Sequence, residues 1–341
     1  MSADTVIRTP EAYAPEARAR HNGHRPENVF MDRWRLEPKT QRVWGVSHAI
    51  WFTLMGVGGG LFILARALDL SSRLGHWFGI PLVDWVSFVA ISVGGLILIG
   101  DLGRPLRAWR AFVNIRTSAI SWGAWADLVF LTLGGLLVLP ALRLGSSQPF
   151  ESLPWEAEAT SGLGQTIEIV AMAAAVVVMV YAGGVLARPR AIPYWHSVNV
   201  PLQFLFSSAA ISMALVLTMA AANDVPIESG DLWILIGFLA VLLVTIVAHL
   251  LTRTEAPGKR ESLDRLLRGR YRGAFVGGVI VLGTIIPLVL AVVALAVDGT
   301  RDALAIVMLV LLVVAGFGLR LLTLRVGIFP PVKEVPGLFK P

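Results

Sequence analysis

The chain has 341 residues, of which 55% are hydrophobic and only 15% are charged, and its mean hydropathy is +0.70. A soluble domain is far less apolar, so we predict a helical protein that crosses a membrane several times. The net charge of +6 then indicates Lys and Arg gathered in loops on one side of the membrane, rather than a nucleic-acid-binding surface. The chain has no cysteine, which excludes a cysteine-ligated iron–sulfur cluster or a thioether-linked haem within it.

The first segment, residues 1–42, is polar and rich in Pro, Arg and Glu, and it lacks the short apolar core of a secretory signal. We expect a basic tail rather than a cleaved leader. The stretch FMDRWRLEPKTQRVW places aromatic residues among arginines, which favours contact with the membrane interface or with a partner protein. Residues 326–341 are expected to form a second tail.

Eight apolar segments follow the first tail, and each is close to the length of roughly 20 residues that a bilayer core requires. We predict an all-α integral membrane protein whose transmembrane domain covers residues 43–325, without a separate soluble domain. Glycine pairs and runs within these segments indicate close helix packing. The eight segments lie at about 43–68, 82–103, 119–142, 165–187, 198–222, 231–252, 274–297 and 302–325.

Basic residues are distributed very unevenly over the connecting segments. If residues 1–42 are cytoplasmic, the opposite side carries only Arg73, Arg143 and Arg301, and nearly all other Lys and Arg lie on the cytoplasmic side. The positive-inside rule therefore predicts that both termini are cytoplasmic.

Several polar and aromatic residues then fall at one level near the cytoplasmic ends of the helices. A rise of 1.5 Å per residue puts His48 and Tyr181 each roughly 7 to 11 Å inside the cytoplasmic boundary. Asp101 lies at the inner end of the second segment, and Trp122 at the inner start of the third. An imidazole, a phenol and a carboxylate beside tryptophans suit an amphipathic ring that exchanges protons, and a quinone is the common ligand of this kind.

Each of these residues also has a simpler interpretation. Tyr181 would serve as an interfacial aromatic residue, and His48 would reach lipid headgroups. Asp101 and Arg104 are three positions apart, so they would share a helix face and form an ion pair. The arginines that follow would extend to lipid phosphates and only fix the topology. The coincidence of all these residues at one depth favours the quinone site.

The stretch DLGRPLRAWRAFVNIRTSAISWGAW, residues 101–125, resembles the signature loop of the NrfD/PsrC family of respiratory membrane subunits. The opening helix SHAIWFTLMGVGGGLFILA is similar to that of the family. So is the segment from Glu168 through Tyr181 to IPYWHSVNVPLQFLFSSAAISMAL, and GFGLRLLTLRVG places Arg320 where the family has an arginine. The resemblance covers most of residues 43–325.

The resemblance implies a fold of two four-helix bundles and a quinone site that faces an iron–sulfur subunit, with no metal or haem in this chain. Tyr181 matches the family tyrosine near the quinone, and Asp101 and Arg104 match the charged turn beside it. His48 corresponds to a polar or histidine ligand on the first helix, with Ser47 and Trp51 as alternatives for that place. Trp122 completes the expected site, and Ala182 departs from the threonine that is usual in the family.

The remaining charges are expected to serve docking and proton transfer. The loop arginines Arg107, Arg110 and Arg116 would face water or the iron–sulfur subunit. Ionisable residues inside the apolar segments are costly there and should face the bundle interior. They would form a proton route to the opposite face, although ion pairs such as one between Asp127 and Arg320 explain them equally well. These residues are Asp127, Glu168, His249 and Arg320.

We therefore expect a membrane-anchoring, quinone-binding subunit of a multisubunit oxidoreductase in a bacterial inner membrane. It would exchange electrons between menaquinone or ubiquinone and a ferredoxin-like iron–sulfur subunit, and so perform a quinone half-reaction. That partner would connect to a catalytic subunit, often a molybdopterin enzyme in this family.

Two other classes of protein are consistent with the sequence. A secondary transporter or proton channel would place its site near the membrane midplane, between discontinuous helices. A haem b cytochrome would need paired histidines, and His48, His196 and His249 all lie toward the inner side.

Overall fold

The structure is a computed structural model, and it describes residues 39–116, 118–156, 162–252, 257–297 and 299–330. The predicted tails, residues 1–42 and 326–341, fall mostly outside these described residues.

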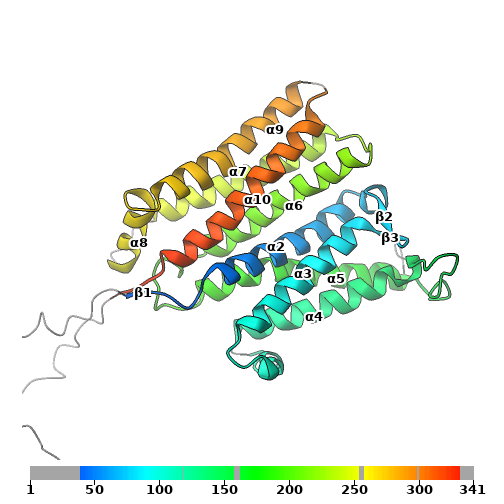
Figure 1. Cartoon of the computed structure of the whole chain (residues 1–341), viewed down its shortest axis with the longest axis horizontal. Coiled ribbons are helices and arrows are strands. Elements are labelled where there is room, and N and C mark those ends of the chain that lie inside the picture. Colours follow the sequence, from blue (N-terminus) through cyan, green and yellow to red (C-terminus); the bar gives the residue numbers. More distant parts are fainter. Residues whose placement is uncertain (1–38, 117, 157–161, 253–256, 298, 331–341) are drawn as a thin grey trace, which may run out of the picture. The chain divides into compact units, whose positions relative to one another are not determined.

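Within the described residues, eight helices are long and apolar enough to cross a bilayer, which confirms the predicted all-α membrane fold (Figure 1). Each covers one of the eight apolar segments of the sequence. The seventh span begins with π-helical hydrogen bonding and continues as an α-helix. The spans are α2 (Val46–Ala67), α3 (Leu82–Asp101), α4 (Ala119–Val138) with η4 (Leu139–Ala141), α5 (Gly162–Ala187), α6 (Asn199–Ala222), α7 (Ser229–Leu251), η5 (Gly273–Ile285) with α9 (Ile286–Ala296), and α10 (Arg301–Arg325).

The spans form two groups of four. In the first group α2 packs against α3 and α5, and α4 packs against α5. In the second group α6 packs against α7 and α10, while the η5–α9 span contacts both α7 and α10 (Figure 1). The groups meet where α6 packs against α2 and α5, and where α10 contacts α2. This arrangement agrees with the predicted pair of four-helix bundles.

Glycines allow α2 to lie very close to its neighbours. A Cβ atom at Gly59 would come within 2.9 Å of the carbonyl oxygen of Ala175 in α5. A Cβ atom at Gly60 would come within 2.5 Å of the hydroxyl of Ser212 in α6. Half of the residues of α2 are therefore buried, and the glycine run of the first apolar segment serves helix packing.

The segments that precede the first span and follow the last span lie together at one end of the helices. Strand β1 (Lys39–Thr40) pairs with β4 (Ile328–Phe329) in antiparallel register. Side-chain bonds tie the end of α10 to the same region, because Gln41 Nε2 donates to the Leu324 carbonyl at 2.7 Å and Trp195 Nε1 donates to the Thr323 carbonyl at 2.7 Å. The described residues thus enter and leave the domain on the same side, and which side of a membrane this is stays a prediction.

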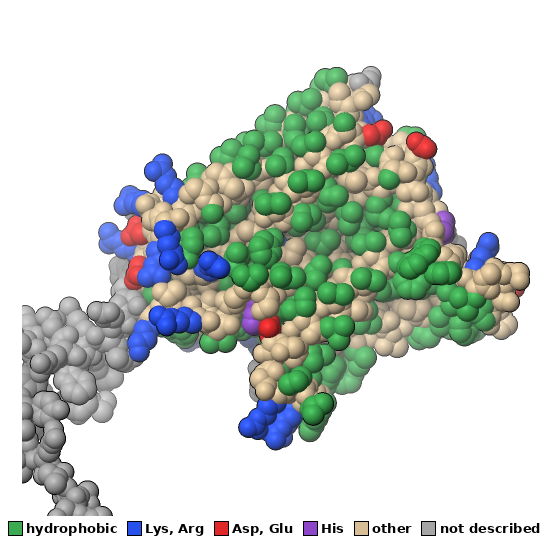
Figure 2. Space-filling view, viewed as in Figure 1, with side chains coloured by type: hydrophobic (Ala, Val, Ile, Leu, Met, Phe, Trp, Pro, Cys, Tyr) green, Lys and Arg blue, Asp and Glu red, His purple; other side chains and the backbone are tan. Residues whose placement is uncertain are grey.

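Short elements complete the two ends of the domain. The side that carries β1 and β4 also carries α8 (Pro257–Leu267), and Figure 2 shows Lys and Arg gathered mostly at this end. Hydrophobic side chains cover the flank of the helices in the same view. The segment between α3 and α4 holds η3 (Pro105–Phe112). The opposite side carries η2 (Ser71–Arg73), β2 (His76–Trp77) and β3 (Ile80–Pro81), and the two strands pair.

The contact between Gly183 of α5 and Pro201 near the start of α6 allows a test of the glycine packing. We expect Gly183→Ala to lower the stability of the domain by about 1–3 kcal/mol, because the added Cβ would overlap the backbone of Pro201. Gly184→Ala is the matched control, since its Cβ would meet no atom within 4 Å. The apparent melting temperature of the detergent-purified variants measures the difference, and equal values for both variants would contradict the packing argument.

Candidate functional site

A cavity of about 150 Å³ lies at the end of the first bundle that carries β1 and β4. Residues from α2, α3, α4 and α5 line it, together with the residues just before α2 and just after α3. Most of its lining surface is apolar, and we call this space the polar cavity because His48, Asp101 and Tyr181 bring ionisable groups into its wall. Its lining residues are Trp44, His48, Trp51, Leu98, Asp101, Leu102, Ile120, Tyr181 and Val185.

Helical spacing brings the α2 residues of the polar cavity together. His48 and Trp51 are three positions apart, so they share the face of α2 that turns toward α3 and α5. Their ring centroids are 6.2 Å apart, and the His48 ring also lies 4.9 Å from that of Trp44. Trp44 falls just before α2, and sequence reasoning missed it.

His48 pairs with Asp101 across the polar cavity. The Nδ1 atom of His48 lies 3.3 Å from Oδ2 of Asp101 and 3.3 Å from the Ser47 hydroxyl. The expected ion pair between Asp101 and Arg104 is wrong, because α3 ends at Asp101 and the two residues no longer share a helical face. Arg104 is exposed, and it is not among the residues that line the cavity.

Tyr181 closes the polar cavity on the α5 side. Its ring stacks on Trp51 at a centroid distance of 6.0 Å, and its hydroxyl donates to the Met55 sulfur at 3.1 Å. Gly123 of α4 makes room for the ring, since a Cβ atom at that position would overlap it. Met55 and Gly123 are therefore positioning residues that sequence reasoning missed, although Gly123 lies in the distinctive SWGAW stretch.

Three buried polar atoms near this end of the first bundle have no hydrogen-bond partner within the described residues. They are Trp51 Nε1, the Ser121 hydroxyl and Asp127 Oδ1. Buried polar groups are nearly always paired, so an unpaired indole N–H in the wall of a cavity indicates a donor that a ligand would satisfy. Asp127 also lies near enough to interact electrostatically with Tyr181.

Tyr181 is also part of the wall of a second, larger space, with a volume of about 410 Å³ between α4 and α5. We call this second space the apolar groove. Trp122 lines this groove and not the polar cavity, in contrast to the expected single site. The indole Nε1 of Trp122 donates to the Ile115 carbonyl at 2.6 Å. The groove residues are Ala119, Trp122, Val176, Val177, Val180, Tyr181, Gly184 and Arg188.

The loop between α3 and α4 is held against α4 by two tryptophans. Besides the bond of Trp122, the Trp125 Nε1 atom donates to the Phe112 carbonyl at 3.0 Å. The loop arginines are exposed, so they are available to a partner or to lipid phosphates, and their docking role stays a prediction. They are Arg107, Arg110 and Arg116.

The buried ionisable residues expected to form a proton route contact different sets of neighbours in different parts of the domain. Arg320 is 1% exposed, and it donates to the hydroxyls of Ser207 and Ser208 and to the carbonyls of Phe204 and Gly316. The suggested ion pair between Asp127 and Arg320 is therefore wrong, because the two residues belong to different bundles and the two terminal guanidinium nitrogens of Arg320 are bonded within its own, while its Nε atom has no partner among the described residues.

His249 has its own neighbours in the second bundle. Its Nδ1 atom lies 3.2 Å from the Ser197 hydroxyl, and its ring lies 4.7 Å from that of Tyr194. Burial raises the pKa of Tyr194, so this residue is a neutral phenol beside the imidazole. His196 contacts the Ala187 carbonyl instead. No group of three or more His, Asp and Glu residues is placed to hold a metal ion in the described part of the chain.

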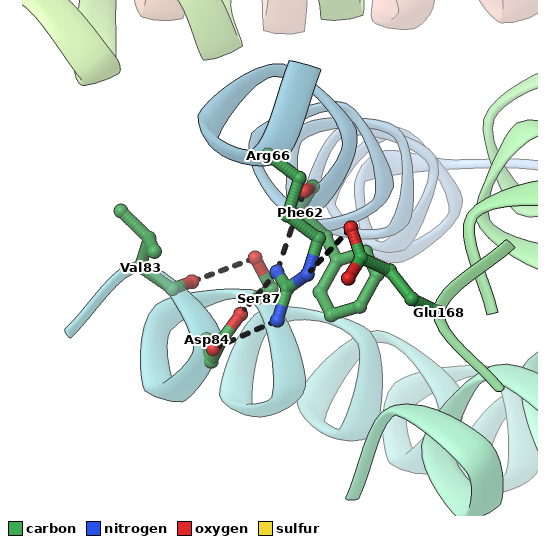
Figure 3. A network of polar contacts seen from close by, with 6 residues as sticks. All are labelled: Phe62, Arg66, Val83, Asp84, Ser87 and Glu168. Carbon is green, nitrogen blue, oxygen red and sulfur yellow. Dashed lines mark hydrogen bonds and ion pairs between the residues drawn. The ribbon is translucent and has the colours of Figure 1, made fainter. Parts of the chain in front are cut away.

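Glu168 belongs to a charged network at the opposite end of the first bundle (Figure 3). Arg66 of α2 donates to both carboxylate oxygens of Asp84 in α3, at 2.6 and 3.0 Å, and its Nε atom lies 3.9 Å from Glu168. Its guanidinium carbon also lies 3.6 Å from the centre of the Phe62 ring. Sequence reasoning missed Arg66 and Asp84, although each is an isolated charge within an apolar segment.

The fold and the cavity define a multi-pass helical membrane protein with a polar aromatic site at one end of its first bundle. Residues 34–331 match the family model described as polysulphide reductase, NrfD, so the chain belongs to the NrfD family. It is similar to the C subunit of the polysulfide reductase of Wolinella succinogenes, with 27% identity over 185 residues. The match covers 52% of this protein and 58% of that relative, so it spans little more than half of the relative's length.

The network around Arg66 yields a stability prediction. Asp84→Asn leaves the Arg66 guanidinium without its bidentate carboxylate, and we expect a loss of up to about 3–5 kcal/mol. The double variant Arg66→Met with Asp84→Leu removes both charges and should regain most of that loss. Thermal unfolding in detergent distinguishes the cases, and wild-type stability of Asp84→Asn would show that the ion pair contributes little.

Proposed function

We propose that this chain is the membrane-anchoring, quinone-binding subunit of a multisubunit respiratory oxidoreductase. The observation that carries the proposal is the polar cavity, where His48, Asp101, Trp51 and Tyr181 meet inside the membrane domain. Membership of the NrfD family supports the proposal, and so does the likeness to a protein named as one part of a polysulfide reductase.

The residues around the polar cavity fit a quinone ring. A quinone carries two carbonyl oxygens that accept hydrogen bonds, and it takes up two electrons and two protons on reduction. Trp51 offers an indole N–H that has no partner among the described residues, and the sulfur of Met55 is only a weak acceptor for the Tyr181 hydroxyl. Trp51 and Tyr181 are thus the two donors that would serve the carbonyl oxygens of menaquinone or ubiquinone.

His48 would move protons at the polar cavity. Because Nδ1 of His48 faces the Asp101 carboxylate, the Nε2 atom is left for a ligand, and the carboxylate favours an imidazole protonated on Nδ1. The Asp101 side chain is 28% exposed, whereas that of His48 is 15% exposed. A proton held by His48 thus has a short path through Asp101 to water.

Electrons would pass between the quinone and a ferredoxin-like iron–sulfur subunit, which connects to a catalytic subunit, often a molybdopterin enzyme. This chain would thus contribute the quinone half-reaction. The exposed arginines between α3 and α4 offer a docking edge near the polar cavity, and they are Arg107, Arg110 and Arg116. The uneven distribution of Lys and Arg supports a bacterial inner-membrane location with both termini, the cavity and the iron–sulfur partner on the cytoplasmic side.

Purification of the intact assembly tests the partner assignment. We expect a cysteine-rich, cluster-binding protein to co-purify with this chain, with the visible absorption of iron–sulfur clusters. A homo-oligomer without such a partner would instead favour a secondary transporter or a proton channel. A Soret band that belongs to this chain would favour a haem b cytochrome.

Substitutions in the polar cavity test the site. In the purified complex we expect His48→Ala to lower quinone-linked turnover by about 100-fold or more, because the proton-transferring imidazole is lost. Tyr181→Phe should lower it by about tenfold through loss of one donor. The control is His76→Ala, an exposed histidine at the opposite end of the domain. Wild-type turnover in both cavity variants would refute the assignment.

A further inference from the structure

The apolar groove is not explained by the chemistry of the polar cavity. It holds about 410 Å³, more than twice the volume of the polar cavity, yet apart from Tyr181 and Arg188 its lining side chains are apolar or absent. The two spaces share one lining residue, Tyr181. A ligand that needs both a polar and an apolar environment would therefore occupy both spaces and pass beside the Tyr181 ring.

The groove follows the outer surface of α5. Its lining residues extend from Val176 to Arg188, a length of roughly 18 Å at the helical rise of 1.5 Å per residue. Val176 is 46% exposed and Val177 is 37% exposed. Both α4 and α5 are long and apolar enough to span a bilayer, so an exposed valine surface on this part of α5 would face lipid hydrocarbon. The groove thus suits a long, flexible hydrocarbon chain.

The wall between the two spaces is fixed in place. Tyr181 is 7% exposed and packs between Trp51 of α2 on one side and Gly123 of α4 on the other. Trp122 is anchored to the Ile115 carbonyl and holds the groove wall on the α4 side. The Tyr181 ring is therefore held in one position at the junction of the two spaces, and a ligand that reaches from one space into the other would contact this ring.

We propose that the apolar groove seats the isoprenoid tail of the quinone whose ring lies in the polar cavity. This inference rests on the proposed function and adds a specificity that the polar cavity alone does not give, namely preference for quinones with a long tail. Burial of each methylene group of a tail against Val176, Val177 and Val180 favours binding, and a quinone without a tail gains none of this. The tail also fixes the direction of entry, from the lipid between α4 and α5.

Gly184 offers a direct way to fill the groove. It lines the groove, and a Cβ atom added to it would meet no heavy atom within 4 Å. A larger side chain at this position therefore occupies groove space without displacing its neighbours. Gly135 of α4 provides a matched control, because it is also a helical glycine with no atom within 4 Å of its added Cβ and it lines neither space.

The experiment compares tailed and tail-less quinones on the full-length protein purified in detergent. Menaquinone-4 is paired with menadione and ubiquinone-2 with ubiquinone-0, and the dissociation constants are measured by quenching of tryptophan fluorescence. We expect the unmodified protein to bind the tailed member of one pair more tightly. Gly184→Leu should reduce this preference by about tenfold, the equivalent of two methylene groups excluded from the groove, and Gly135→Leu should retain it.

The outcomes separate the two proposals. If no quinone binds the unmodified protein, the proposed function fails, and the tail assignment fails with it. If quinones bind but Gly184→Leu keeps the full preference for the tailed molecule, the quinone site stands and the groove assignment is wrong, with a bilayer acyl chain left as its occupant. Equal loss of preference in Gly184→Leu and Gly135→Leu would also overturn the groove assignment, because the effect would not be local.

Discussion

The packing of α2 against α3, α5 and α6 is the contact on which the rest of the structure depends. Helix–helix association within lipid gains little from the hydrophobic effect, so it relies on close van der Waals contact between small residues. The glycines of α2 supply that contact at Ala175 of α5 and Ser212 of α6. The same helix then carries His48 and Trp51 at one end and Arg66 at the other, so its packing sets both polar regions of the first bundle.

The domain binds the terminal nitrogens of its two buried guanidinium groups in two different ways. Arg66 is neutralised by the carboxylate of Asp84, with Glu168 nearby, whereas Arg320 is bound by two serine hydroxyls and two backbone carbonyls. Both sets of bonds offset the high free-energy cost of a charge in a low-dielectric interior. Some buried donors have no partner among the described residues, and they include both Trp51 Nε1 at the polar cavity and Arg320 Nε in the second bundle. What distinguishes the Trp51 donor is its place beside His48, Asp101 and Tyr181 in the wall of the polar cavity.

The eight spans could be predicted from the sequence because length and apolarity are local properties of each segment. That His48, Asp101 and Tyr181 lie at one level of the bundle was also predictable, since the helical rise is constant. Rotation about the helix axis was not, because it depends on neighbours that are distant in the sequence. For this reason Trp122 lies in the apolar groove, in contrast to the expected single site. Arg104 lies outside the polar cavity for a different reason, because α3 ends at Asp101.

The pairing of β1 with β4 has a consequence for the order in which the protein assembles. The backbone partners of Lys39 and Thr40 are Phe329 and Ile328, which lie at the other end of the domain sequence. A ribosome makes the last span after all the others, so the strand before the first span waits unpaired throughout synthesis. Contacts between such distant residues form late because the intervening residues must first be ordered. The small sheet therefore forms only after all eight spans have been inserted. Its formation marks the completion of the folded domain.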